Sequence, residues 1–159
     1  MGRTVAPDLF DLNRFVAAQD PVMATVLAEL RQGQKRTHWI WFIFPQAEGL
    51  GSSQMARHYA IRSKDGAAAY LAHPVLYPRL LECTKAALSF ADKSAHDIFG
   101  SPDDFKFRSS MTLFNSLGTR LVFRAALDQF FSGIPDEKTL AILARWSERF
   151  SIRAGASPQ

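Results

Sequence analysis

Residues 38–53, with the sequence HWIWFIFPQAEGLGSS, contain the first group of side chains that can bind a ligand. Gly49 and Gly51 permit turns and a close approach of ligand atoms to the backbone. Ser52 and Ser53 precede a segment that we expect to be helical, and the free N–H groups at the start of a helix attract anions. This combination is typical of a site that holds a phosphate or a carboxylate.

Four side chains around this glycine turn complete the predicted site. Arg57 lies one turn into the expected helix and can pair with an anion. Trp41 offers a face on which a flat ring can stack, and Gln46 offers a polar amide. His38 is a candidate acid or base because an imidazole titrates near neutral pH. The alternative interpretation is structural, since glycines form turns, serines cap helices, and an apolar run such as 39–44 is typical of a core.

The second group of polar side chains lies in residues 99–114, FGSPDDFKFRSSMTLF, where the spacing predicts a helix with one apolar and one polar face. If the polar face lines a cleft, Arg108 can hold an anion and Ser109 can hydrogen-bond the ligand. Asp103 or Asp104 can then orient the anion or act as a catalytic base. If the polar face meets solvent, Asp104 and Arg108 form an ordinary helical ion pair.

Several well-known binding motifs are excluded. The GLGSS segment at 49–53 lacks the Gly-Lys-Ser/Thr ending of a P-loop and the third glycine of a dinucleotide-binding fingerprint, and it does not match G-x-S-x-G. The four histidines never occur at the spacing of an H-E-x-x-H metal helix. Cys83 is the single cysteine, so we expect a buried, unreactive thiol in a reducing compartment. We therefore predict no metal and no cofactor.

The positive charge of the chain is local. Residues 31–64 contain six basic residues and one acidic residue, whereas the rest of the chain contains 13 basic and 14 acidic residues. A confined basic segment favours a small anion over a long nucleic acid backbone. We therefore expect an anionic small-molecule ligand and consider nucleic acid an unlikely partner.

The chain as a whole predicts an all-α fold. Its 159 residues, 47% of them hydrophobic, are enough for one compact domain with its own core. The apolar spacing predicts about seven helices separated by short segments rich in Pro, Gly and Ser. The aromatic run 39–44 has no partner strand, so we expect it to be a short buried helix or an irregular segment. The single domain spans 1–159, with a core at about 8–150 and a tail at 151–159.

The sequence predicts where the protein is located, because it lacks both a membrane-spanning apolar run and a signal peptide pattern. No apolar run reaches the roughly 20 residues that cross a bilayer. The first residues, with Asp8 and Asp11 after Arg3, lack the layout of a signal peptide. We expect a cytoplasmic protein without a membrane partner.

Five motifs along the chain carry a family resemblance: WFIFPQ at 41–46, GLG at 49–51, YLAHP at 70–74, FGSPDD at 99–104 and FRSSMTLF at 107–114. Together they resemble the family named domain of unknown function 1810, over nearly the whole chain. The resemblance implies a single all-helical domain and supplies no reaction. Some members carry the label calpastatin, a protease inhibitor. Calpastatin's inhibitory segments are disordered until bound, whereas this chain has the apolar content of an independently folded domain.

The leading hypothesis is one basic cleft in which the glycine turn faces the second polar group. His38, Gln46 and Arg57 would lie opposite Asp104, Arg108 and Ser109, and the cleft would bind a small phosphate-bearing or nucleotide-like ligand. Whether the protein is an enzyme stays open. If it is one, these groups suit a hydrolase or transferase that acts at a phosphoryl or glycosyl centre.

Two other classes of function stay open. In the first, the protein is an interaction module without catalysis, and the basic aromatic segment docks a partner protein. In the second, Trp39 and Trp41 bind RNA weakly, which requires exposed rings. The positions of Gln46 and Arg108 separate the hypotheses: a shared cavity favours a ligand, whereas opposite faces favour the interaction module.

Overall fold

The computed structural model describes residues 7–155, and their side chains as far as residue 148. The described chain forms ten helices: α1 Asn13–Gln19, α2 Met23–Arg31, α3 Ile40–Ile43, α4 Gln54–His58, α5 Lys64–Ala72, α6 Leu76–Leu88, α7 Ala95–Phe99, α8 Asp103–Asn115, α9 Leu121–Phe131 and α10 Glu137–Gly155. Seven of these helices have seven residues or more. The prediction of an all-α fold with about seven helices is confirmed. None of the described helices is long and apolar enough to cross a membrane.

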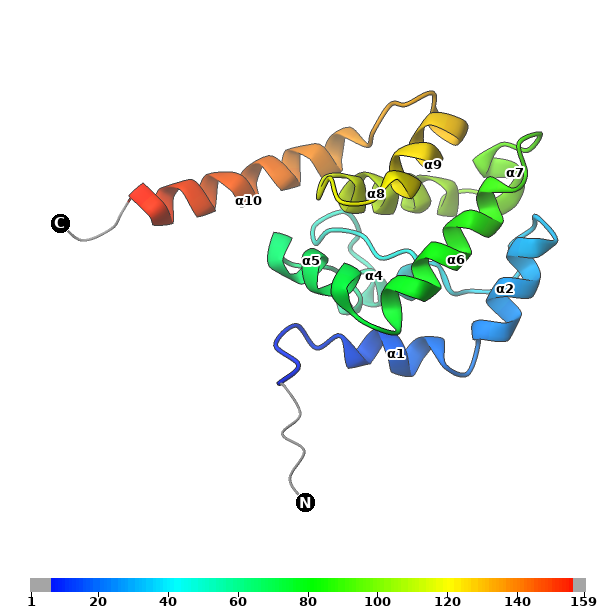
Figure 1. Ribbon diagram of the computed structural model, residues 1–159, viewed down its shortest axis with the longest axis horizontal. Helices are drawn as coiled ribbons and strands as arrows, with labels where there is room; N and C mark the ends of the chain where they lie inside the picture. Colours follow the sequence, from blue (N-terminus) through cyan, green and yellow to red (C-terminus); the bar gives the residue numbers. More distant parts are fainter. Residues whose placement is uncertain (1–6, 156–159) are drawn as a thin grey trace, which may run out of the picture.

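Helix α8 is the centre of the fold. In Figure 1 it lies between α1 and α2 on one side of the molecule and α9 and α10 on the other, and it packs most extensively against α9. The predicted apolar face of α8 is fully buried, at Phe107, Met111 and Phe114. Each such side chain contributes about 1.5–3 kcal/mol of hydrophobic stabilisation. A helix buried this deeply fixes the position of its remaining polar residues.

The aromatic run is part of the core. It forms the one-turn helix α3, and Trp39 is only 1% exposed. The ring of Phe44 meets the rings of Phe99 and Phe107 edge to face, with centroids 5.8 and 4.9 Å away. The prediction of a buried short helix is confirmed. Trp41 is the half-buried exception in this segment.

A buried carboxylate fixes the loop before α3. Glu29 of α2 is 6% exposed and accepts hydrogen bonds from the backbone N–H groups of Arg36 and Thr37, at 2.6 and 3.0 Å. The Thr37 hydroxyl donates to it at 2.6 Å and Trp39 Nε1 at 3.0 Å. Although burial opposes the charge, these donors lower the pKa of Glu29 to about 2. The loop is therefore held by an ionised side chain that the sequence pattern did not single out.

Helix α10 continues into the segment 151–159 that we predicted as a tail. It runs to Gly155. Residues 156–159 lie outside the described part of the chain. Figure 1 shows that the far end of α10 extends away from the other helices.

Candidate functional site

The two predicted groups of polar residues meet at one cavity of about 540 Å³. Its first wall comes from the loop between α3 and α4, its second from the start of α8, and its third from the segment that joins α9 to α10. The lining residues are Gln46, Leu50, Gly51, Pro102, Phe105, Lys106, Arg108, Ser109, Ile134, Pro135, Asp136, Glu137 and Lys138. We call this space the α8 cavity. Gln46 and Gly51 thus line the same cavity as Arg108 and Ser109, and their role in binding a ligand stays a prediction.

Backbone bonds and glycines shape the first wall. The N–H of Ile61 donates to the Gln46 carbonyl at 2.9 Å, and the N–H of Glu48 donates to the Ile61 carbonyl at 2.8 Å. Gly49 has a φ of +106°, which side chains rarely adopt. A Cβ on Gly51 would lie 2.7 Å from the Cβ of Ala56. Both glycines are thus required by the course of the loop, and Gly51 alone of the two lines the cavity.

Arg108 joins the second wall to the third. Its Nε and Nη2 atoms donate to the carbonyl of Ile134 at 2.9 and 2.8 Å, and its guanidinium lies 5.1 Å from the centre of the Phe131 ring. The predicted ion pair with Asp104 does not form. Among the described residues, no carboxylate lies within salt-bridge distance of Arg108. A carbonyl satisfies N–H groups without cancelling charge, so the guanidinium stays electrostatically available to an anion.

Lys106 is held beside Arg108 by two contacts. Its ammonium lies 3.3 Å from Asp103 Oδ1 and 5.1 Å from the centre of the Trp41 ring. Asp103 Oδ2 also pairs with the buried Lys35 at 2.7 Å. The carboxylate of Asp103 therefore contacts two ammonium groups, and its single negative charge leaves this group of three side chains with a net charge of +1. Asp103 does not line the cavity. Because both of its oxygens contact ammonium groups, it positions Lys106 and is not free to act as a base.

The third wall makes the cavity mixed in charge. Thr112 Oγ1 donates to the Arg108 carbonyl at 2.8 Å and accepts from the N–H of Asp136 at 2.9 Å. Asp136 in turn caps α10 by accepting from the N–H and hydroxyl of Thr139, at 2.9 and 2.6 Å. The lining contains two acidic residues, Asp136 and Glu137, and three basic residues, Lys106, Arg108 and Lys138. The expectation of a basic cleft is corrected to one of mixed charge with a small positive excess.

Other predicted site residues lie outside the α8 cavity. Helix α4 has only five residues, and the Ser53 hydroxyl caps it by accepting from the N–H of Ala56 at 3.1 Å. None of the residues of this short helix is buried, and its start lies outside the lining of the α8 cavity. The residues that do not line the cavity are His38, Trp41, Gly49, Ser52, Ser53, Arg57, Asp103 and Asp104. His38 and Arg57 are exposed.

Asp104 has a local role at the start of α8. Its Oδ1 atom accepts from the Ser101 hydroxyl at 3.0 Å and from the N–H of Phe105 at 2.9 Å. His96 Nδ1 lies 3.1 Å from the Ser101 hydroxyl and 3.8 Å from Asp104 Oδ2. The Ser101 proton is thus directed to the carboxylate and not to the imidazole. This geometry is that of a helix start and does not activate a serine nucleophile.

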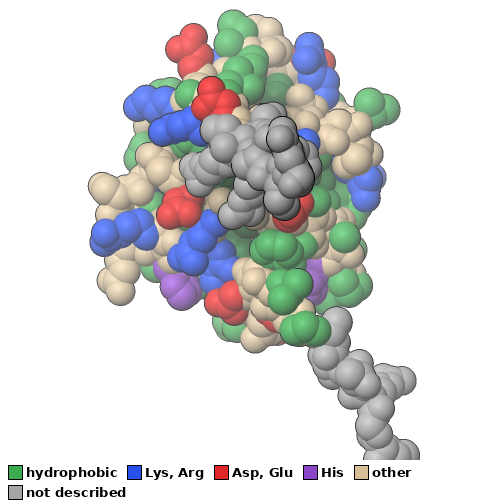
Figure 2. Space-filling model, turned by 90° about the vertical axis from the view of Figure 1, so that its left-hand side faces the viewer, with side chains coloured by type: hydrophobic (Ala, Val, Ile, Leu, Met, Phe, Trp, Pro, Cys, Tyr) green, Lys and Arg blue, Asp and Glu red, His purple; other side chains and the backbone are tan. Residues whose placement is uncertain are grey.

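The basic segment 31–64 does not converge on one cleft. Arg31 pairs with Glu82 of α6 at 2.8 Å, and Lys35 pairs with Asp103 of α8 at 2.7 Å. On the face shown in Figure 2, Lys and Arg side chains are separated by acidic and apolar ones. Neutralisation by partners distant in sequence explains why the local charge excess does not become one basic patch.

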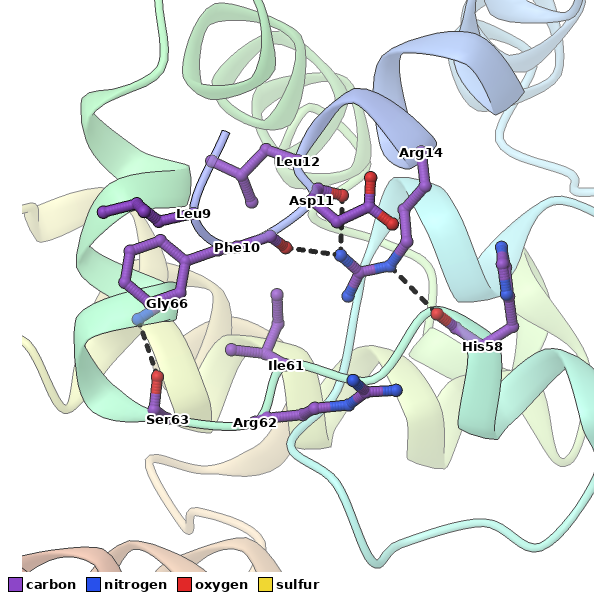
Figure 3. A pocket seen from close by; sticks show the side chains of 10 residues that line it. All are labelled: Leu9, Phe10, Asp11, Leu12, Arg14, His58, Ile61, Arg62, Ser63 and Gly66. Carbon is purple, nitrogen blue, oxygen red and sulfur yellow. Dashed lines mark hydrogen bonds between the residues drawn. The ribbon is translucent and has the colours of Figure 1, made fainter. Parts of the chain in front are cut away.

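A second cavity, of about 240 Å³, was not anticipated from the sequence. It lies between the turn at 9–14 and residues 58–66 (Figure 3). Its lining is formed by Leu9, Phe10, Asp11, Leu12, Arg14, His58, Ile61, Arg62, Ser63 and Gly66. We call it the Arg14 cavity. Arg14 occupies an ordinary position in an amphipathic helix, so no motif marked it.

The lone cysteine behaves as expected. Cys83 is buried in α6, and burial raises the pKa of its thiol to about 12. A thiol that stays protonated at neutral pH is a weak nucleophile. Among the described residues, no three His, Cys, Asp or Glu side chains form a group that could hold a metal ion.

Comparison with known proteins places the chain in a family. The family model described as "Protein of unknown function (DUF1810)" matches residues 9–143, a range that includes both cavities. The crystal structure of the conserved hypothetical protein Rv1873 from Mycobacterium tuberculosis is 50% identical in sequence. It matches with a TM-score of 0.85, over 86% of this chain and 99% of that chain. No curated protein matches the sequence. The convergent motifs, the all-helical fold and this match agree that the chain belongs to the DUF1810 family of proteins of unknown function.

Proposed function

We propose that the α8 cavity binds a small ligand that combines an anionic group with a flat apolar part, as a phosphate-bearing or nucleotide-like molecule does. One observation carries the proposal: two segments about 55 residues apart meet at a cavity that contains a guanidinium without a carboxylate partner. Opposite charge and hydrogen-bond donors in one recess favour anion binding.

The cationic groups of the cavity are held in place before a ligand arrives. Lys106 is fixed by Asp103 and the Trp41 ring, and Arg108 by the Ile134 carbonyl and the Phe131 ring. Ordering a long side chain on binding costs about 0.5–1.5 kcal/mol. Because much of this ordering is already present, an anion would retain more of its interaction free energy.

Two further features support a ligand with a ring and polar groups. Phe105 is 60% exposed and lies in the same wall as Lys106, which suits stacking of a flat ring. Gln46 and Glu137 line the cavity and carry an amide and a carboxylate. Both of these groups can accept hydrogen bonds from the hydroxyl groups of a ligand. A sugar between a ring and a phosphate would use this combination.

The proposal concerns binding and includes no reaction. The three candidate catalytic residues, His38, Asp103 and Asp104, do not line the cavity. Gln46 and Arg108 line the same cavity, which favours a ligand over an interaction module. Weak RNA binding requires exposed rings, and Trp39 is 1% exposed.

Thermal unfolding with a panel of nucleoside monophosphates, nucleoside diphosphates and sugar phosphates tests the proposal. At a ligand concentration ten times the dissociation constant, binding adds about 1.4 kcal/mol to the free energy of unfolding. For a chain of this size the unfolding midpoint then rises by roughly 3–5 °C. At least one class of ligand should produce this rise at 10 mM, and inorganic phosphate alone should produce less.

Two variants and one control make the result specific. Lys106→Gln removes a cation from the lining, and Phe105→Ala removes the exposed ring. Arg124→Gln removes a surface charge on α9, where Arg124 pairs with Asp128. We expect Lys106→Gln and Phe105→Ala to lose most of the ligand-induced shift and Arg124→Gln to keep it. No shift with any ligand, or an equal shift in all three variants, contradicts the proposal.

A further inference from the structure

The Arg14 cavity contains an arginine whose charge has no acidic partner in contact. Arg14 Nη1 donates to the carbonyls of Phe10 and Asp11, both at 2.7 Å. Its Nε and Nη2 atoms donate to the carbonyls of His58 and Ala60, both at 2.9 Å. Within the described part of the chain, no carboxylate oxygen lies within 4 Å of this guanidinium. Four neutral acceptors satisfy its N–H groups and leave its positive charge in the cavity.

A second guanidinium adds to this charge. Arg62 also lines the cavity, and Figure 3 shows its guanidinium on the side of the cavity where that of Arg14 lies. The side chain of Arg62 is 70% exposed, and its nearest acidic partner is Glu48, 3.8 Å away. Partial burial and the nearby Arg62 both lower the pKa of Arg14, so its positive form is penalised at this position. A bound anion would relieve that penalty.

The remaining lining defines the rest of the ligand. Leu9, Phe10 and Ile61 form an apolar side of the cavity, and Phe10 and Ile61 both face Gly66 of α5. A Cβ on Gly66 would lie 3.5 Å from the Phe10 ring, so the ring packs closely on the helix. Asp11 is the one acidic residue of the lining, and it opposes the two arginines. The net charge of the lining is therefore positive before His58 is counted.

We propose that the Arg14 cavity is a second binding site, which takes a small oxyanion attached to an apolar group. The oxyanion would lie between Arg14 and Arg62, and the apolar group against Leu9, Phe10 and Ile61. The volume of about 240 Å³ suits a molecule of the size of phenyl phosphate. This site is separate from the α8 cavity, with which it shares no lining residue.

Titration with phenyl phosphate, followed by two-dimensional amide NMR, tests the inference. The signals of His58, Ser63 and Gly66 should shift in a saturable way, and added sodium chloride should weaken the effect. Signals of Gly51 and Ser109 report the α8 cavity separately, so failure at one site is distinguishable from failure at the other. Absence of saturable shifts at His58, Ser63 and Gly66 up to 20 mM phenyl phosphate overturns the inference.

Two variants should change the dissociation constant for phenyl phosphate in opposite directions. Arg62→Gln removes a cation from the lining and should raise the dissociation constant about threefold or more. Asp11→Asn removes the opposing carboxylate and should lower it by a similar factor. Asp11 has a φ of +50°, a conformation that Asn tolerates well, so this variant should fold.

Arg57→Gln is the matched control, because Arg57 is an exposed arginine of the adjacent helix that lines neither cavity. The dissociation constant of Arg57→Gln for phenyl phosphate should equal that of the original protein. Equal changes in Arg57→Gln and Arg62→Gln, or weaker binding in Asp11→Asn, would show that phenyl phosphate senses only the general charge of the surface. Either result overturns the inference.

Discussion

The two cavities each contain an arginine bound to backbone carbonyls, and the two arginines differ in what they hold together. Arg14 donates to four carbonyls in two chain segments about 48 residues apart, whereas Arg108 donates to the single carbonyl of Ile134. Arg14 is therefore first a structural link, and Arg108 keeps more of its guanidinium for a ligand. The contrast teaches that the role of an arginine depends on its tertiary partners and not on the motif around it.

Removing Arg14 should give the largest effect and test this contrast directly. Arg14→Met keeps much of the apolar packing but leaves four carbonyls without their donor, so we expect a loss of about 3 kcal/mol in the free energy of unfolding. Arg108→Met should lose about 1–1.5 kcal/mol, because one carbonyl is affected. Urea unfolding measures both. Equal losses in the two variants would show that the cavities do not differ in this way.

Acid should weaken the α8 side of the molecule more than the Arg14 side. Glu29 holds the loop that brings Lys35 to Asp103, and its pKa falls from 4.5 in the unfolded chain to about 2 in the folded protein. Since the folded pKa is the lower one, its stabilisation is complete above pH 4.5 and is lost as the pH falls from 4.5 to 2.

Glu29→Gln should therefore lose about 2–3 kcal/mol at pH 7 and lose progressively less, relative to the original protein, below pH 4.5. Urea unfolding between pH 7 and pH 3 measures this dependence. Amide exchange at pH 3.5 should then increase at Arg36 and Thr37 before it increases at Ser63 and Gly66. A difference between Glu29→Gln and the original protein that does not change with pH would contradict the assignment.

Thr112→Val tests how the third wall of the α8 cavity is held in place. Valine keeps the shape of threonine but leaves the N–H of Asp136 without its acceptor, so we expect a loss of about 1–2 kcal/mol. The change should also loosen the third wall, and hydrogen exchange of the Asp136 amide is the direct measurement. Unchanged exchange would mean that the cap of α10 holds this wall without Thr112.

Ser110→Ala should have the smallest effect and is the natural companion to Thr112→Val. The Ser110 hydroxyl is fully buried in α8 and makes no hydrogen bond within the described part of the protein. Removing a buried polar group without a partner is neutral or stabilising, so the free energy of unfolding should stay within about 0.5 kcal/mol or rise. A loss above 1 kcal/mol would indicate a partner for this hydroxyl.

The sequence predicted the parts of the molecule that local pattern controls. The buried face of α8 followed from the spacing of Phe107, Met111 and Phe114, and the buried α3 from its apolar run. The convergence of Gln46 with Arg108 followed from two unusual polar groups in an apolar chain. Phe105 is a further signal in the sequence. It lies off the apolar face of its helix, and an aromatic ring at such a position is exposed and can contact a ligand.

The parts that were not predicted depend on contacts between distant segments. Arg57 was expected at the cavity, but α4 ends at His58 after five residues and presents Arg57 to solvent. We predicted that Asp104 would pair with Arg108. Instead Asp104 accepts from the Ser101 hydroxyl, and Arg108 donates to the Ile134 carbonyl. The third wall at 134–138 reads as an ordinary helix start. Nothing local distinguishes such residues from surface positions.

The central claim is that residues 46–51 and 102–109 form one ligand site, and amide NMR during titration with the nucleotide and sugar phosphate panel tests it most directly. We expect saturable shifts of the Gly51, Phe105 and Ser109 signals together, with one dissociation constant for all three. Shifts confined to one of the two segments, or no shift of these signals with any member of the panel at 10 mM, would contradict it.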